Sequence, residues 1–130
     1  MRTLLAALFV SVGTARLAHA EDAMELFQKA ISLSNMGKTK EALEAAAQAT
    51  KLDAKSPLGP YASGLILMSQ REQAKAIAAF DEAIQRDPKF VAAYDRRGDA
   101  KLKSGQFKES IEDFDVFLKS NPNFAPEHWR

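Results

Sequence analysis

Residues 76–90 read AIAAFDEAIQRDPKF, and residues 110–124 read SIEDFDVFLKSNPNF. The two stretches lie 34 residues apart and share Ile, Phe-Asp, Pro and Phe at matching places, and Gly64 recurs in the same register as Gly98. A period of about 20 to 50 residues is typical of chains built from stacked supersecondary units. The repeat therefore predicts an elongated array that acts by presenting a binding surface.

The register extends over most of the chain and predicts three units followed by the first residues of a fourth. Their approximate limits are 23–56, 57–90, 91–124 and 125–130. Gly37, for example, falls one period ahead of Arg71 and two periods ahead of Gly105. An array normally ends in an atypical solvating repeat, and none precedes Arg130. We therefore expect the chain to be a fragment whose fourth unit stops within a helix.

Residues 1–20 follow a different pattern from the rest of the chain. A positive start at Arg2 precedes a short apolar run, and Ala18-His19-Ala20 supplies small residues at the end. This three-part pattern is typical of a secretory signal peptide, cleaved here after Ala20. The apolar run is far shorter than the roughly 20 residues that a membrane-spanning helix needs. We therefore expect an exported protein, periplasmic or secreted, without a stable membrane span; an uncleaved amphipathic arm is the alternative.

Charge and cysteine content exclude several kinds of function. The chain carries 18 basic and 17 acidic residues, and removal of residues 1–20 leaves 16 and 17. A nearly neutral chain lacks the clustered basic charge that phosphate contacts require, so nucleic acid is not an expected partner. The absence of cysteine removes disulfides, thiolate metal sites and a cysteine nucleophile. Because His128 is the single histidine after residue 20, we predict no metal site, no Ser-His-Asp triad and no cofactor.

Each unit is predicted to be a pair of antiparallel helices. In the second unit, Ser56-Pro57 provides an N-cap oxygen followed by a residue suited to the first helical turn. Pro88 and Pro122 end the second helices of their units, because the residue before a proline is displaced from the helical region. Strict alternation of apolar and polar residues is absent and alanine is abundant, which favours closely packed helices over strands.

The spacing of large and small residues resembles that of the tetratricopeptide repeat family, in which a large residue, a small residue, an aromatic residue and a proline recur in each unit. The third unit fits best. It has Tyr94, Gly98, Phe114 and Pro122 in these four places. The resemblance covers essentially all of 23–130 and implies an all-α, right-handed solenoid of antiparallel helix pairs.

The first helices depart from the family pattern at two places. Lys29, Ser63 and Arg97 stand where the family prefers leucine. Lys101 stands where it prefers tyrosine. We therefore expect looser packing of the first helices than in an ideal repeat.

The resemblance also implies where a ligand would bind, because in this fold the first helix of each unit lines the concave side of the array. The expected peptide-binding residues are Phe27, Ile31, Tyr61, Leu65, Met68, Asp95, Arg96, Asp99 and Lys103. The apolar side chains would take apolar groups of a partner, and the charges of the third unit would fix its direction. Mutual packing of the apolar members, and an ion-pair ladder on the third helix pair, are the alternatives.

One subset of the family clamps the C-terminal carboxylate of chaperones with paired Lys and Asn residues. Phe27, Ile31 and Ala62 stand in three of these places, and only Arg96 matches. The resemblance therefore does not extend to cytosolic co-chaperone action. The carboxylates around Asp113 are interpreted as a solvated helix face, because no cleft is predicted that would shift their pKa values.

The predicted function is that of an exported scaffold that holds a protein or peptide segment in its concave groove, without catalytic residues. One alternative is an enzyme in which the repeats position a substrate for a catalytic domain beyond residue 130. Another is a structural spacer or oligomerisation module. Because the third unit presents an uncovered face, self-association through that C-terminal face is also expected.

Overall fold

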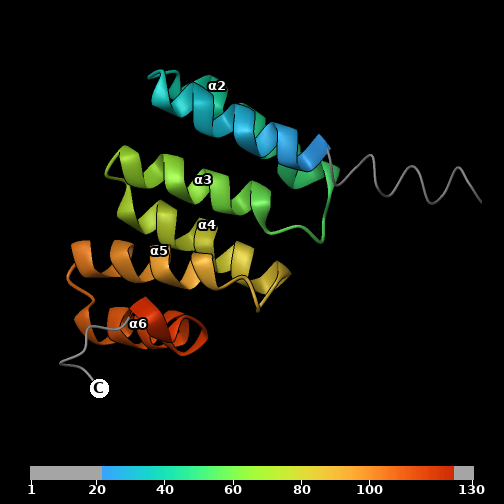
Figure 1. The fold of residues 1–130 in the computed structure, drawn as a ribbon. Helices are drawn as coiled ribbons and strands as arrows, with labels where there is room; N and C mark the ends of the chain where they lie inside the picture. The colour runs from blue at the N-terminus through green and yellow to red at the C-terminus, as the bar shows by residue number, and fades with distance from the viewer. Residues whose placement is uncertain (1–21, 125–130) are drawn as a thin grey trace, which may run out of the picture.

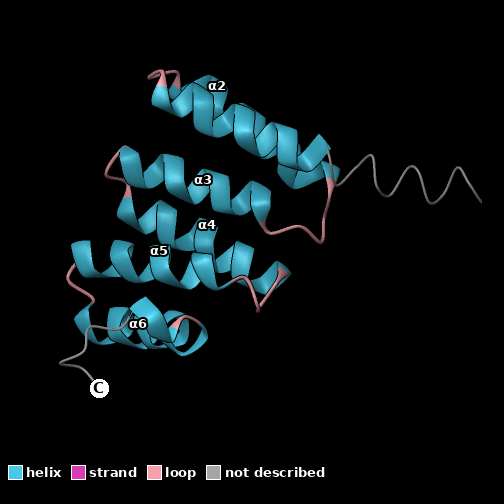
Figure 2. Ribbon diagram, viewed as in Figure 1, coloured by secondary structure: helices cyan, strands magenta, loops and turns pink. Residues whose placement is uncertain are grey.

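The computed structural model describes residues 22–124, which form a stack of helix pairs (Figures 1 and 2). The N-terminal helix is described over 22–35. It is followed by α2 (Thr39–Leu52), α3 (Leu58–Ser69), α4 (Gln73–Arg86), α5 (Val91–Lys103), α6 (Phe107–Ser120) and the 3-10 turn η1 (Pro122–Phe124). No strand occurs in this part of the chain, which confirms the predicted all-helical fold.

The predicted signal peptide, with its cleavage site after Ala20, lies outside the described residues, as does the predicted start of a fourth unit at 125–130. Between 22 and 124, no helix combines the length and the apolar character needed to cross a bilayer.

Each helix packs on the helices that precede and follow it, so the array is linear. α3 contacts both α2 and α4, and α5 contacts both α4 and α6 (Figure 1). The two first helices α3 and α5 also touch directly. Side chains one period apart on successive first helices are therefore neighbours on one face of the stack.

The start of α3 follows from Ser56-Pro57, as the sequence predicts. The side-chain oxygen of Ser56 accepts a hydrogen bond from the backbone N–H of Leu58 at 3.2 Å. Pro57 already has helical dihedral angles (φ −78°, ψ −9°). The hydroxyl satisfies one of the N–H groups that a helix start leaves without an intrahelical partner.

The second helices end at an aspartate in the first two units. Asp87, before Pro88, has an extended backbone (φ −142°, ψ 97°), which confirms the predicted stop of α4. Asp53 has nearly the same conformation (φ −134°, ψ 101°), although no proline follows it. In both cases the carboxylate accepts the backbone N–H two residues further on, from Lys55 at 3.1 Å and from Lys89 at 3.0 Å. The aspartate turn thus ends these helices with or without a proline.

The predicted register is confirmed by the backbone at the ends of the first helices. Gly37, Arg71 and Gly105 all have positive φ, at 78°, 61° and 84°. The N–H of Arg71 donates to the carbonyl of Met68 at 2.9 Å. This is a hydrogen bond expected where an α-helix ends at a residue in the left-handed conformation. Arginine adopts this conformation at a cost that glycine avoids, so the position is set by the repeat and not by local preference.

Glycines allow the two helices of a pair to approach closely. A Cβ atom at Gly64 would overlap ring carbons of Phe80, whose side chain is completely buried. At Gly98 a Cβ atom would lie 2.8 Å from Cε1 of Phe114. Each phenylalanine therefore fills the space above the glycine of its own helix pair.

Small residues also build the core between the first two units. The cluster consists of Ala30, Ala42, Ala45, Ala46, Ala62 and Ile66. It draws on the N-terminal helix, α2 and α3, so the first pair is joined to the second by close contact of short side chains.

One arginine joins the second pair to the first through the backbone. The guanidinium of Arg86, at the end of α4, donates to the carbonyls of Thr50 at 3.0 Å and Asp53 at 3.1 Å. These carbonyls lie at the C-terminal end of α2, where a helix presents acceptors without intrahelical partners and partial negative charge. Nothing in the repeat pattern predicts this contact, because Arg86 has no counterpart in the other units.

Candidate functional site

The predicted binding residues of the first two units meet at Tyr61. The rings of Phe27 and Tyr61 stack, with centroids 6.1 Å apart and planes 9° apart. Phe90 meets Tyr61 edge-on at 5.0 Å, and Phe80 lies below it at 5.9 Å. Tyr61 remains partly exposed, so this aromatic cluster reaches the surface. Phe90 was not predicted as part of the site; its recurrence at the end of a unit was visible, but not its contact with Tyr61.

The aliphatic members of the predicted set are half-buried. Ile31 packs, with Phe27, against the alanine core between the first two units. Leu65 and Met68 lie on α3 and are partly exposed. Mutual packing, the alternative considered in the sequence analysis, occurs between Phe27 and Tyr61, and it leaves part of each side chain at the surface.

The charged members all lie on α5, but only two of them pair with each other. The amine of Lys103 is 2.9 Å from Oδ2 of Asp99, one turn away. Asp95 is half-buried and Arg96 is exposed, and the side chain of neither forms a hydrogen bond or ion pair with any residue between 22 and 124. The predicted ion-pair ladder is thus reduced to one exposed pair that excludes Arg96.

A second group of charges, on the side of α5 that faces α6, was not predicted. Arg97 donates two hydrogen bonds to the carboxylate of Asp113, at 2.8 and 2.7 Å, and a third to Asp81 on α4 at 2.7 Å. Lys101 reaches the same Asp113 carboxylate at 2.9 Å. The guanidinium of Arg97 also lies 5.4 Å from the ring centre of Tyr94. This ion cluster connects α4, α5 and α6.

The ion cluster corrects two expectations. The side chain of Asp113 is 5% exposed, so it does not belong to a solvated face. Arg97 and Lys101, in places where the family prefers leucine and tyrosine, do not loosen the packing but supply both cations of the cluster. The sequence signal that could have revealed the ion cluster is a combination. Two cations, Arg97 and Lys101, lie on one helix face, and the carboxylate of Asp113 follows sixteen residues after Arg97.

The ion cluster shifts the pKa values of its members in opposite directions. Burial acts to raise the pKa of Asp113, but the hydrogen bonds from Arg97 and Lys101 outweigh it and hold that pKa below its ordinary value. The hydrogen bond to Asp113 raises the pKa of Arg97, although burial opposes it. Both groups are therefore fixed in their charged forms, as a structural cluster requires and a proton-transfer site does not.

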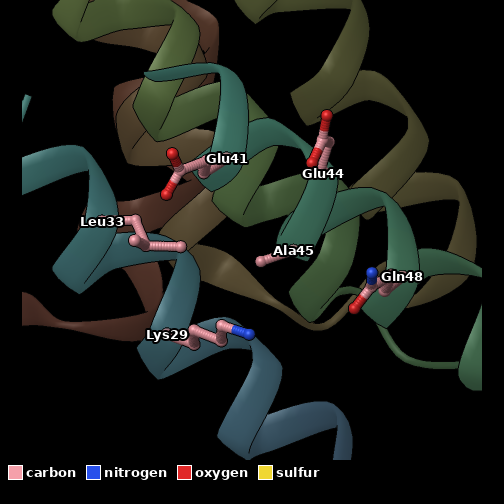
Figure 3. A pocket seen from close by; sticks show the side chains of 6 residues that line it. All are labelled: Lys29, Leu33, Glu41, Glu44, Ala45 and Gln48. Atoms are coloured by element: carbon pink, nitrogen blue, oxygen red, sulfur yellow. The ribbon is translucent and has the colours of Figure 1, made fainter. Parts of the chain in front are cut away.

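A pocket of about 190 Å³ lies between the N-terminal helix and α2 (Figure 3). It is lined by Lys29, Leu33, Glu41, Glu44, Ala45 and Gln48. None of these residues belongs to the predicted binding set. In the repeat register, Lys29, Leu33 and Ala45 correspond to Arg97, Lys101 and Asp113. The pocket is therefore the place that the ion cluster fills in the third unit, and the described residues hold no cluster suited to a metal ion.

Replacing Asp113 with asparagine leaves Arg97 and Lys101 without their shared counter-charge. We expect the free energy of unfolding to fall by about 3 kcal/mol at neutral pH, the lower end for breaking a buried ion pair. Because the folded pKa of Asp113 is depressed, its contribution is complete above the ordinary carboxyl pKa of about 4 and is lost as pH falls through the folded value. Chemical denaturation at several pH values should show the difference between wild type and Asp113→Asn shrinking below about pH 4.

The matched control is Asp115→Asn, on the same helix but exposed. Its stability should stay within about 0.5 kcal/mol of wild type. An Asp113→Asn protein as stable as wild type at neutral pH, or a difference that does not change with acid, would contradict the structural role of the ion cluster.

Comparison with known proteins gives the same fold. Residues 27–89 match the tetratricopeptide repeat family model. The chain is 33% identical over 64 residues to the tetratricopeptide repeat and J domain-containing co-chaperone DNJ1 of Cryptococcus neoformans var. grubii. It is 30% identical over 112 residues to Hsp70-Hsp90 organizing protein 1 of Glycine max. The matches cover 49% and 81% of this chain but only 12% and 20% of those proteins.

Among solved structures, the first tetratricopeptide domain of Spaghetti (RPAP3), determined with the HSP90 peptide SRMEEVD bound, superimposes with a TM-score of 0.75 at 23% identity. The alignment covers 79% of this chain and 84% of that domain. The family model, the solved domain and the stacked helix pairs with a 34-residue register agree. Residues 27–89 therefore carry tetratricopeptide repeats, and residues 22–124 have the tetratricopeptide fold.

Proposed function

We propose that this chain is a scaffold that binds a segment of another protein on the face formed by its first helices. The observation that carries the proposal is the row of partly exposed apolar side chains on that face, centred on the stacked rings of Phe27 and Tyr61. Aromatic side chains supply much of the binding energy at protein interfaces because they bury large areas at low entropic cost. The Spaghetti domain, which has the same fold, holds a peptide.

The rest of the site supports binding rather than chemistry. The carboxylate with a shifted pKa, Asp113, is held between two cations, and the pocket beside Lys29 lies outside the apolar row. The names of the two relatives describe a co-chaperone and an organiser of Hsp70 and Hsp90. A scaffold is thus favoured over a substrate-positioning part of an enzyme.

Replacing Tyr61 with alanine removes the ring at the centre of the apolar row. We expect the affinity for the bound segment to fall at least about tenfold, the effect of losing an interface hot spot. The measurement is affinity capture of partners from an extract of the source cells, followed by titration of the purified partner. Because Tyr61 also contacts buried Phe80, a second variant, Leu65→Ala, changes another partly exposed residue of the same face.

Met36→Ala is the control, since it removes an exposed apolar side chain in the first turn, outside both the row and α6. Circular dichroism should show folded protein for all variants. If both Tyr61→Ala and Leu65→Ala retain the wild-type partner and affinity, the proposed binding face is wrong and a structural spacer is favoured.

Export is part of the proposal. The residues that support it are the apolar run and the small residues that end at Ala20. Mass spectrometry of the protein recovered from its source should give an N-terminus at Glu21. An intact N-terminus at Met1 would contradict it.

We also propose that a second copy of the chain covers the outer face of α6. Phe107 and Ile111 are 62% and 60% exposed on this face. Ile77 lies one period before Ile111, on α4, and is half-buried. The next helix, α5, packs on α4, whereas no described helix packs on α6 in the same way. The apolar face of α6 is thus built like an internal interface but lacks its cover in the described part of the chain.

The opposite end of the stack does not offer a suitable cover. The N-terminal helix exposes Glu25 and Ser32 where α3 buries Gly59 and Ile66 against α2. Polar side chains at these places would be buried unpaired against Phe107 and Ile111 in a head-to-tail contact. Two copies are therefore expected to meet through α6 of each, in a symmetric dimer.

Ile111→Lys places a charge in the centre of this face. Sedimentation velocity should show that the average mass of wild type rises with concentration and that of Ile111→Lys does not. Met36→Lys, at an equally exposed residue in the first turn, should behave as wild type. A wild type that stays monomeric at high concentration, or an Ile111→Lys protein that associates equally, would refute the dimer.

A further inference from the structure

One row on the first-helix face runs through Phe27, Tyr61 and Asp95, each 34 residues after the last. The first two are in contact, because their rings stack at 6.1 Å with nearly parallel planes. The helices that carry the second and third, α3 and α5, touch directly. Asp95 therefore continues the row beyond the ring of Tyr61, and the row changes from aromatic to acidic at the third unit.

A second row, one helical turn away, has the same order. It runs through Ile31, Leu65 and Asp99, again with a spacing of 34 residues. All three side chains are partly exposed. The face thus presents two parallel rows, each with two apolar residues followed by a carboxylate. In both rows the carboxylate lies in the third unit.

Of the two carboxylates, Asp95 lacks a counter-charge. Asp99 is paired with Lys103 at 2.9 Å, whereas Asp95 is half-buried and unpaired among residues 22–124. A partly desolvated carboxylate without a partner gains more from an incoming cation than an exposed one does, because solvent screens it less.

The neighbouring cation Arg96 does not neutralise Asp95 in the structure. It forms no ion pair in the described part of the chain and is exposed. Its counterpart one unit earlier, Ala62, is completely buried in the core between α2 and α3. Arg96 does not share the burial of Ala62 and stays at the surface, and it belongs to neither of the two rows.

We propose that the first-helix face selects a segment with apolar side chains followed by a lysine or arginine, the cation reaching Asp95 and the apolar groups lying on the rings of Tyr61 and Phe27. This proposal rests on the proposed binding function and specifies its partner. The aliphatic stem of a lysine or arginine can lie along Tyr61 while its charge meets the carboxylate. An acidic segment such as SRMEEVD, which the Spaghetti domain holds, would bring further carboxylates to a face that already carries the unpaired Asp95.

The test is an array of acetylated and amidated nine-residue peptides, each with two apolar residues at varied spacing followed by one variable residue. Every sequence is present as a matched triple that differs only in Lys, Gln or Glu at the variable position. Binding of the fluorescently labelled 130-residue chain is quantified at low ionic strength, and the strongest triples are then titrated in solution. Lysine peptides should bind about tenfold more tightly than their glutamate counterparts, and SRMEEVD should bind weakly.

Two substitutions at Asp95 test the assigned contact. Asp95→Asn should abolish the preference for lysine over glutamate, and Asp95→Lys should reverse it so that glutamate peptides bind more tightly. Asp115→Lys makes the same charge change at an exposed aspartate on α6, outside the rows, and should keep the wild-type preference. Increasing the salt concentration should reduce the preference of wild type.

The outcomes separate this inference from the function on which it rests. Peptide binding that is lost in Tyr61→Ala but is indifferent to the charge of the variable residue overturns the inference and leaves the binding face in place. A preference for glutamate, or a lysine preference that survives Asp95→Lys, also overturns it. If no peptide of the array binds wild type, both the inference and the proposed peptide-binding function fail.

Discussion

The structure depends on the close approach of the two helices in each pair. Gly64 brings α3 so near to α4 that the ring of Phe80 occupies the space that any side chain at residue 64 would need. The buried ring then supports Tyr61 from below, at 5.9 Å. A packing contact inside one helix pair thereby positions Tyr61, the central aromatic residue of the proposed binding face. The same packing thus stabilises the pair and orients that residue.

The same places in the repeat are used in different ways along the stack. Where the first unit has Lys29 and Ala45 beside an open pocket, the third unit has Arg97 and Asp113 in a closed ion cluster. Such a cluster is stable only if every charge is paired, because an unpaired charge in this place carries the full cost of desolvation. The contact of Arg97 with Asp81 extends it to the second unit, so the cluster also helps to specify which pairs are neighbours.

Features that recur with the period could be predicted from the sequence. The helix ends near Pro88 and Pro122, the positive φ of Arg71 and the packing of Gly64 all follow from rules that involve a few adjacent residues or one repeat distance. The candidate binding residues were assigned to the face of the first helices from the family resemblance, because periodicity alone does not show which helices line the inner side. The change along that face from apolar residues in the first two units to charged residues in the third then follows directly from the sequence.

Features that break the period could not be predicted. The burial of Asp113 requires cations from α5 and a position deep between two helices, and the contacts of Arg86 require backbone carbonyls from another unit. The edge-on contact of Phe90 with Tyr61 joins residues 29 apart, which is not the repeat distance. Periodicity places backbones relative to one another, but side-chain partners depend on three-dimensional neighbours that differ from unit to unit.

A double-mutant cycle of Gly64→Ala and Phe80→Leu, read by denaturant unfolding, tests the close approach of α3 and α4 most directly. Alanine in a helix normally gains about 1 kcal/mol over glycine, whereas overpacking a core costs about 1–3 kcal/mol. The structure predicts that Gly64→Ala destabilises wild type and costs clearly less in the Phe80→Leu background, where the ring is absent. A neutral or stabilising Gly64→Ala, with additive effects in the double mutant, would contradict the account.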